Sequence, residues 1–462
     1  MTRAWTDRRG RTSARLWAAL VLGIVASGSP QLGAQTQPGT RPPTLRLGLA
    51  EAIARAAEAS HQLAERRARQ AGARAAVRGR EAAGLPSLAV TAGYTRTNHV
   101  DEFGVPQPDG SFRLIYPDIP DTYRTRVFAQ WPIYAGGRTN ALERAAEAEA
   151  RAAGSDLDAA RADLRLEVVH AYWRLATATE SVRVLEQAIA RAEAHLRDVR
   201  SRFDAGFVPP NDVLSVEARR SRQEVQLIEA RNLREAAALD LRRLIGVAAE
   251  TPLELSEPLD GGTAAAGSPP VRVQDGLAGA LGRRPERQAL ASRLEGAADR
   301  AAAARAARRP SINVGAGMDY ARPNTRIFPL TDEWRSSWDV GVNVTWTLWD
   351  SGRASADVAE AAAAVDAARS RLSELDTRLA LEIRQRVLDL DSARAAVRAA
   401  TDGVRSAAEA RRVVSDRFEA GVIGTTEVID AQGALLEAEL DRTRALANVR
   451  LAEARLERAL GR

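Results

Sequence analysis

The sequence contains no cysteine among its 462 residues, and lysine is absent as well. Without cysteine the chain has no disulfides, no thiolate metal sites and no lipid-modified cysteine. Aromatic residues make up only 5% of the chain. Beyond the N-terminal region there is no uninterrupted apolar run of roughly 18 residues, so we predict that no helix crosses a membrane.

Catalytic motifs are missing too. The four histidines, His61, His99, His170 and His195, are scattered without metal-ligand spacing. No nucleophile elbow, P-loop or paired-glycine nucleotide motif is present. Arginine alternates with glutamate and aspartate instead of clustering on one face, which argues against a nucleic-acid partner. We therefore predict no enzymatic activity, no metal site and no cofactor.

Residues 1–34 have the features of a secretory signal peptide. Five arginines precede the apolar stretch Leu16–Ala26, and small residues lead to Ala34. The stretch is shorter than the roughly 20 residues of a membrane span. The segment carries five arginines and one aspartate, so its removal lowers the formal net charge from +6 to +2. An exported chain without a membrane helix is either soluble in a periplasm or inserted as a β-barrel.

Two motifs occur twice. WPIYAGGR at Trp131–Arg138 recurs as WTLWDSGR at Trp346–Arg353, and RFDAG at Arg202–Gly206 recurs as RFEAG at Arg417–Gly421. Both pairs are separated by 215 residues, which indicates a tandem duplication. We therefore expect a first repeat, a Pro- and Gly-rich linker and a second repeat, at residues 35–246, 247–272 and 273–462.

Long helices follow the WPIYAGGR and WTLWDSGR motifs. Apolar residues there step by seven, with one step of eleven, and the second repeat copies this with one miss, at Arg411. Steps of seven predict a left-handed seam between helices, and the extra four residues locally unwind it. Each helix is expected to run roughly 65 residues, or about 100 Å. The seam residues are Leu157, Leu164, Leu175, Val182, Ile189, Leu196 and Phe203, then Leu372, Leu379, Leu390, Val397, Val404 and Phe418.

Four short segments alternate apolar residues with small or polar ones, and this favours strands over a pure coiled coil. They lie near 87–98, 122–134, 311–320 and 336–349. Their length suits tilted membrane strands. The alternative is an ordinary hairpin half-buried on a core, since four strands cannot close a barrel alone. The polar, Pro-rich segments between the strands of each pair are expected to be exposed loops.

The chain resembles the TolC-like outer membrane efflux proteins over nearly its whole mature length. The residues that carry the resemblance are WPIYAGGR and WTLWDSGR, and the turns RFDAGFVPPNDVLSVEA and RFEAGVIGTTEVIDAQ. The resemblance implies a mainly α fold with a transmembrane β portion. Three protomers would form a twelve-stranded β-barrel in the outer membrane lipid and a periplasmic α-helical barrel of long coiled-coil helices, with the linker in an equatorial belt.

The resemblance also implies a function. The homotrimer would be a passive exit duct in the outer membrane of a Gram-negative-type cell, for efflux or type I secretion. A periplasmic adaptor would couple it to an inner-membrane pump. Drugs, metal ions and polypeptides all remain possible cargo. The alternative from another class is a soluble periplasmic coiled-coil scaffold or adaptor whose hairpins pack on its own core.

The same resemblance assigns candidate residues. Turns near 203–211 and 418–426 would be the periplasmic tips, although Pro209-Pro210 stiffens the first and Ile423 replaces a polar or basic residue of some relatives. Adaptor contact would fall on residues at both tips: Arg202, Phe203, Gly206, Val208, Arg417, Phe418, Gly421 and Thr425. Sharp strand-to-helix corners are expected at Gly136, Gly137, Arg138, Gly352 and Arg353, with Asp350 capping the second long helix.

Three acidic residues are candidates for the channel constriction. Glu427 and Asp430 are three residues apart, so they share one helix face and would form stacked acidic rings in a trimer. Asp212 is the third candidate, with Asn211 as the helix cap. The alternative for all three is local, because acids in a first helical turn complement the helix dipole.

Overall fold

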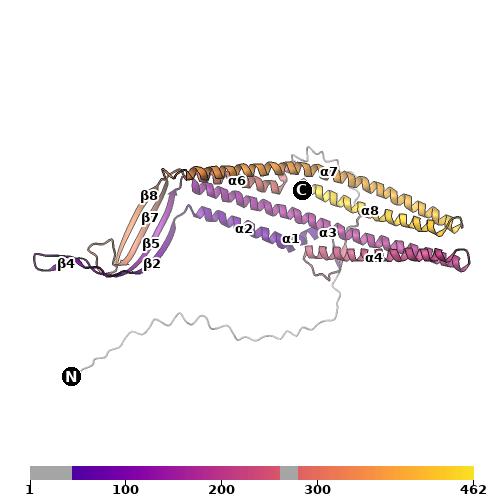
Figure 1. The fold of residues 1–462 in the computed structure, drawn as a ribbon, viewed down its shortest axis with the longest axis horizontal. Coiled ribbons are helices and arrows are strands. Elements are labelled where there is room, and N and C mark those ends of the chain that lie inside the picture. Colours follow the sequence, from indigo (N-terminus) through magenta and orange to yellow (C-terminus); the bar gives the residue numbers. More distant parts are fainter. Residues whose placement is uncertain (1–43, 261–278) are drawn as a thin grey trace, which may run out of the picture. The chain divides into compact units, whose positions relative to one another are not determined.

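The computed structural model describes residues 44–260 and 279–462. The predicted signal peptide, part of the linker and the start of the second repeat lie outside the described residues. The rest is mainly helical, and each repeat has the order helix, strands, very long helix, turn, helix (Figure 1). The helices are α1 Leu49–Ala59, α2 His61–Ala82, α3 Arg138–Asp204, α4 Pro210–Ile245, α6 Pro285–Ala306, α7 Arg353–Glu419 and α8 Thr425–Ala459.

Both long helices are unbroken. Helices α3 and α7 have 67 residues each, so both span about 100 Å. The seam predicted in α3 is largely buried: Leu157, Leu164, Leu175, Val182 and Leu196 are all at most 5% exposed. They pack against α4 and α8. The heptad pattern therefore predicted the length of the helices and most of the face that α3 buries, but it was wrong at Ile189, which is half-buried, and at Phe203, which is 41% exposed.

The two repeats are buried unequally. Helix α3 buries residues along its whole length, whereas α7 buries only Leu379, Ile383, Leu390 and Phe418. Leu381 and Leu388 of α7 are 57% and 68% exposed. Matched sequences thus have different surroundings within one chain, and α7 leaves an apolar face uncovered in the described protomer.

A belt of short strands crosses the helices where the linker begins. Strand β1 (Leu45–Leu47) pairs in parallel with β6 (Leu253–Leu255). Tyr172 of α3 is fully buried beneath them, and its hydroxyl donates a hydrogen bond to the Leu47 carbonyl at 3.2 Å. The same hydroxyl accepts a hydrogen bond from the Glu257 backbone N–H at 3.3 Å. The pKa of Tyr172 is raised, chiefly because burial disfavours the charged phenolate.

One four-stranded antiparallel sheet joins the two repeats, in the order β2-β5-β7-β8. The expected strand ranges lie close to those observed, except that β8 ends four residues early. At that point the chain leaves the sheet for the corner, and the Trp346 indole N–H donates to the Arg308 carbonyl at 3.2 Å. The strands are β2 Ser87–Arg96, β5 Asp121–Tyr134, β7 Ser311–Arg322 and β8 Arg335–Thr345.

The first loop holds an additional hairpin. Strand β3 (Phe103–Pro106) pairs with β4 (Phe112–Tyr116) around a turn at Gly110. An exposed, polar, Pro-rich loop was expected there, and no strands. The hairpin signal is weak because its strands are only four and five residues long and include a proline.

The strand-to-helix corners depend on left-handed backbone. Gly137 and Gly352, which immediately precede α3 and α7, have φ of 87° and 92°. In the second repeat the Asp350 carboxylate accepts hydrogen bonds from the N–H groups of Gly352 and Ala354, at 3.0 and 2.7 Å. Asp350 thus satisfies free amides at the start of α7, as predicted from its position.

We expect Gly137→Ala and Gly352→Ala to destabilise the protein by about 1–2 kcal/mol each, because a Cβ is disfavoured at positive φ. The measurement is the thermal unfolding of the purified protein. Gly403→Ala in mid-α7, where a Cβ would meet nothing within 4 Å of the protomer, is the control and should be neutral or stabilising. Equal losses in all three variants would contradict the corner argument.

Candidate functional site

The two helix tips have the same backbone geometry. At the end of α3, the Gly206 N–H donates to the Phe203 carbonyl and the Phe207 N–H donates to the Arg202 carbonyl. At the end of α7, the N–H groups of Gly421 and Val422 donate in the same way to the carbonyls of Phe418 and Arg417. Gly206 and Gly421 have φ of 76° and 73°. These are glycine-dependent helix ends of the Schellman type, which explains why the RF-x-A-G motif recurs.

The tips pack against each other within one protomer. Phe418 is 5% exposed and lies in a cluster with Leu196, Val199, Val216 and Val428. Ile423 and Val208 pack against the same cluster. Val208 was predicted to contact an adaptor, but its neighbour Phe207 is the more available residue, at 81% exposure.

Arg202 connects the end of α3 to the end of α7. Its guanidinium donates to the carbonyls of Phe418 and Glu419, at 2.9 and 3.3 Å, and lies over the Phe418 ring at 4.3 Å. A cation at a helix C-terminus satisfies carbonyls that have no partner in the helix and complements the helix dipole. Arg202 therefore links the two repeats, and we call its contact with the end of α7 the clasp.

The matching residues of the other repeat have different surroundings. Arg417 corresponds to Arg202 in the duplication but is exposed. Phe203 corresponds to Phe418 but is 41% exposed. Within the described chain, Arg202 thus contacts Phe418, whereas the matching residues Arg417 and Phe203 both lie on the surface.

Asp212 differs from the other two acidic candidates. The Thr425 hydroxyl donates to its carboxylate at 2.9 Å, so Asp212 joins the start of α4 to the start of α8. Asn211 was expected to cap α4, and this expectation was wrong. The helix already begins at Pro210, with Pro209 at the cap position, because proline suits the first helical turn.

Glu427 and Asp430 are both exposed in the first turns of α8. Within the described chain, neither carboxylate has a hydrogen-bond or ion-pair partner. The structure therefore brings Asp212 and Thr425 together and leaves Glu427 and Asp430 free at the surface of the tip.

His195 is a feature of the tip that the sequence did not reveal. Its ring is 6% exposed and meets the Phe418 ring edge-on at 5.1 Å between centroids, while its Nε2 is buried without a hydrogen-bond partner. The pKa of His195 is lowered, first by burial and then by Arg202, with Asp198 opposing. The available signal was its place beside seam residue Leu196.

The four-stranded sheet has one apolar face that is exposed. It includes Leu88 on β2, Trp131 on β5, Met318 on β7 and Trp338 on β8, which are 46–75% exposed. Val340, Val342 and Val344 extend it at 60–67%. A contiguous apolar surface of this kind marks a contact with lipid or protein. Among the helices of the described chain, none has the length and apolar character needed to cross a bilayer.

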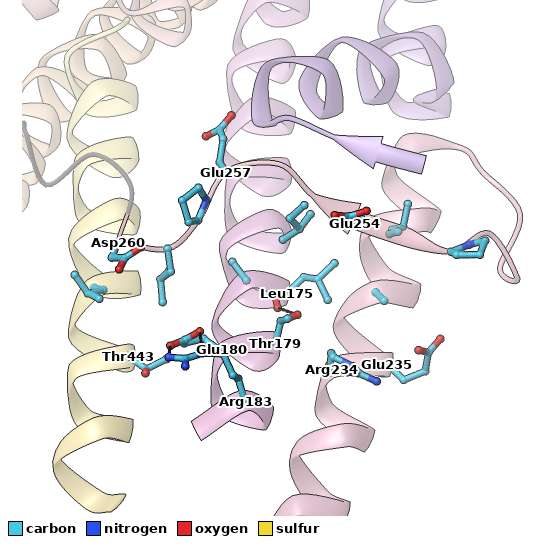
Figure 2. A pocket seen from close by; sticks show the side chains of 18 of the residues that line it. Leu175, Thr179, Glu180, Arg183, Arg234, Glu235, Glu254, Glu257, Asp260 and Thr443 are labelled. Atoms are coloured by element: carbon cyan, nitrogen blue, oxygen red, sulfur yellow. Dashed lines mark hydrogen bonds and ion pairs between the residues drawn. The ribbon is translucent and has the colours of Figure 1, made fainter. Parts of the chain in front are cut away.

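A pocket of about 630 Å³ lies beside the belt, between α3, α4, α8 and the linker (Figure 2). Thr179, Glu180, Arg183, Arg234 and Asp260 are among its polar lining residues. Glu180 and Arg183 pair with each other one turn apart on α3. In the residues that the structure covers, no cluster of His, Asp or Glu is suited to hold a metal ion.

Duplicated long helices, paired tips and a shared sheet with an exposed apolar face define a tandem-repeat protein with a helical part and a sheet part. The family model described as "Outer membrane efflux protein" matches residues 52–247 and 277–462. The chain belongs to the outer membrane efflux protein family.

Curated relatives and solved structures agree with this assignment. Protein CyaE of Bordetella pertussis is 27% identical over 95% of this chain and 94% of its own length. The cobalt-zinc-cadmium resistance protein CzcC of Cupriavidus metallidurans is 24% identical over 77% of this chain and 81% of its own length. The outer membrane protein VceC of Vibrio cholerae shares the fold with a TM-score of 0.74, at 20% identity over 89% and 96% of the two chains. The structure of CusC has a TM-score of 0.75 at 16% sequence identity, over 93% of this chain and 95% of that chain.

The resemblance seen in the sequence is thus confirmed. The protein is an outer membrane exit duct of an efflux or secretion system, with a long periplasmic helical extension. The family is one of transport ducts rather than enzymes. This class also excludes the soluble scaffold that was the alternative interpretation.

We expect the buried His195 to make the tip contact sensitive to pH. Because its pKa is lowered, the packed tip favours neutral imidazole; the contact is fully stable above the ordinary pKa of about 6.5 and weakens as pH falls below it. If the tips close the duct, channel current should rise several-fold between about pH 7.5 and pH 5. His195→Asn, which does not titrate, is the control, and an identical pH response in that variant would contradict the prediction.

Proposed function

We propose that three copies of the chain form a duct that is closed at the helix tips, where an adaptor coupled to an inner-membrane pump engages it. The observation that carries this proposal is the four-stranded sheet, with its exposed apolar face and two unpaired edges at β2 and β8. An open sheet edge is not tolerated in lipid. Pairing β8 of each copy with β2 of the next would close twelve strands and remove every edge.

The unequal burial of the repeats supports a ring of protomers. Around such a ring, first and second repeats alternate, so contacts between protomers resemble contacts within one. The exposed apolar residues of α7, Leu381 and Leu388, would then be covered by a neighbouring copy. Channels of this family act with adaptor proteins and inner-membrane pumps, which is the basis for proposing those partners here.

The tips would close by repeating the clasp. Within a protomer, Arg202 of the first repeat holds the end of α7. Between protomers, the equivalent Arg417 would hold the end of the neighbour's α3 and cover Phe203. This accounts for the exposure of both residues in the single chain. Phe207 and Val422, 81% and 64% exposed beyond the turns, would remain available to an apolar adaptor surface.

The acidic ring depends on a position at which the two repeats differ in sequence. Glu427 corresponds to Asp212, but Pro210 corresponds to Thr425 and has no hydroxyl or N–H to donate. The bond that ties Asp212 inside a protomer therefore has no equivalent for Glu427 between protomers. Glu427 and Asp430 would stay free and form two stacked rings of carboxylates that favour cations at the constriction.

Single-channel conductance in planar bilayers tests the duct and its constriction together. We expect wild type to give a small, cation-selective conductance. Glu427→Ala/Asp430→Ala should lower the permeability ratio of K⁺ to Cl⁻ several-fold, because two carboxylate rings disappear. Glu409→Ala/Asp416→Ala is the control, since it removes two exposed acids that pair with Arg412 on α7.

The outcomes separate the parts of the proposal. Failure of wild type to insert would contradict the duct. Conductance with equal selectivity in all three proteins would keep the duct and place its constriction away from Glu427 and Asp430.

Crosslinking tests the repeated clasp, because the chain has no cysteine of its own. With a short bismaleimide, Phe203→Cys/Arg417→Cys should yield covalent dimers and trimers. Arg202→Cys/Phe418→Cys should instead link mainly within a protomer, since these two residues already touch there. The readout is a denaturing gel. Linkage only within single chains for the first pair would refute the contact between protomers.

A further inference from the structure

A second charged cluster lies on the other face of the sheet, far from the tips. Asp319 of β7 accepts hydrogen bonds from Arg124 Nε at 2.7 Å and Arg126 Nη1 at 2.6 Å, both from β5. Arg126 also donates through Nη2 to Asp339 of β8 at 2.9 Å. Arg326, from the segment after β7, pairs with the same Asp339 at 3.1 Å. Three arginines thus share two aspartates.

Burial within this basic cluster is one-sided. The Asp319 side chain is only 3% exposed, and that of Asp339 is 31% exposed. The Arg124 and Arg326 side chains are 56% and 46% exposed. Asp319 therefore acts as a covered counter-ion, Arg126 and Asp339 are both partly exposed, and the most exposed charges of the cluster are the guanidinium groups of Arg124 and Arg326. The cluster keeps one positive charge in excess.

The neighbouring residues leave room for this arrangement and hold it in place. A Cβ on Gly317 would come within 2.4 Å of Arg126 Nη2, so glycine lets that guanidinium lie flat across β7. Asn324, 4% exposed, donates to the Arg335 carbonyl at 3.0 Å and accepts from the Arg326 N–H at 3.0 Å. The segment that carries Arg326 is thus fixed to the sheet rather than free.

Strand register places the cluster on the polar face, near the loop end of the sheet. Thr91, Arg126, Asp319 and Ser337 lie abreast on the four strands. The exposed apolar residues, including Met318, occupy the alternate positions. If the apolar face meets lipid, the polar face meets the inside of the barrel.

We propose that this basic cluster forms a ring of arginines at the outer mouth of the duct, and that the ring binds multivalent anions. The inference rests on the proposed trimer, in which three clusters would face one lumen with an excess of three positive charges. Arginine is suited to phosphate, sulfate and carboxylate groups because its planar fork donates two parallel hydrogen bonds. Rings of arginine are also the usual basis of anion selectivity in pores.

The mouth and the tip would act independently. The corners separate the sheet from the long helices, and the tips lie about 100 Å further along. Electrostatic screening at physiological ionic strength acts over about 8 Å. The acidic tip would therefore favour cations at one end of the tunnel while the basic mouth favours anions at the other.

Sided block of single-channel current tests the mouth. The probe is inositol hexakisphosphate, added to one compartment at a time. We expect block of wild type from the loop side and not from the tip side. Arg124→Gln/Arg326→Gln should weaken this block about tenfold or more, and Asp339→Asn, which removes a counter-ion, should strengthen it. Arg96→Gln is the matched control, since Arg96 pairs with Asp121 at the same sheet end but on the alternate face.

Each result has one meaning. Conducting wild-type channels without loop-side block, or with equal block in wild type and the double variant, would overturn the basic ring and leave the duct intact. Absence of channels in wild type would overturn the duct itself. A purely structural cluster would alter oligomer stability in the double variant and in Asp339→Asn without shifting block in opposite directions.

Discussion

One chain alone cannot pair the backbone groups at the edges of the four-stranded sheet or cover its apolar face. The rest of the structure depends on this constraint. Its four strands expose a contiguous apolar face to one side, and the outer edges of β2 and β8 have unpaired backbone groups. In water such a sheet would aggregate, and in lipid its edges would be too costly. The corners at Gly137 and Gly352 fix how the long helices leave this sheet, so closure of the strands would also set the spacing of the helices.

The duplication explains why the two repeats share their backbone geometry, but it does not give equivalent side chains the same surroundings. Equivalent motifs produce equivalent backbone: two corners with positive φ and two glycine-dependent tips. Their side chains nevertheless have different environments, because within one protomer α3 lies between other helices while α7 leaves one side open. Arg202 and Arg417 are the clearest case, since one is clasped and the other exposed.

Composition alone does not show that the charged side chains have different environments in different parts of the structure. Apart from four histidines, arginine supplies all the basic side chains, and most of its ion pairs are exposed pairs along or between helices that contribute little to stability. The pairs around Asp319 differ because the acid is covered and the arginines share it. At the tip the acids are exposed instead, since Glu427 and Asp430 have no ion-pair partner among the residues that the structure describes.

The sequence by itself determined the duplication, the long helices, the glycine corners and the family, because these depend on local periodicity and on backbone conformations that few residues adopt. It also indicated the cap at Asp350. Only the tertiary structure decided which of two equivalent residues is buried and that Asp212 bonds to Thr425. It also brought Arg126, Asp319 and Asp339 together across three strands. Such contacts join residues about 200 positions apart, and no local pattern encodes them because they arise only when the two repeats pack.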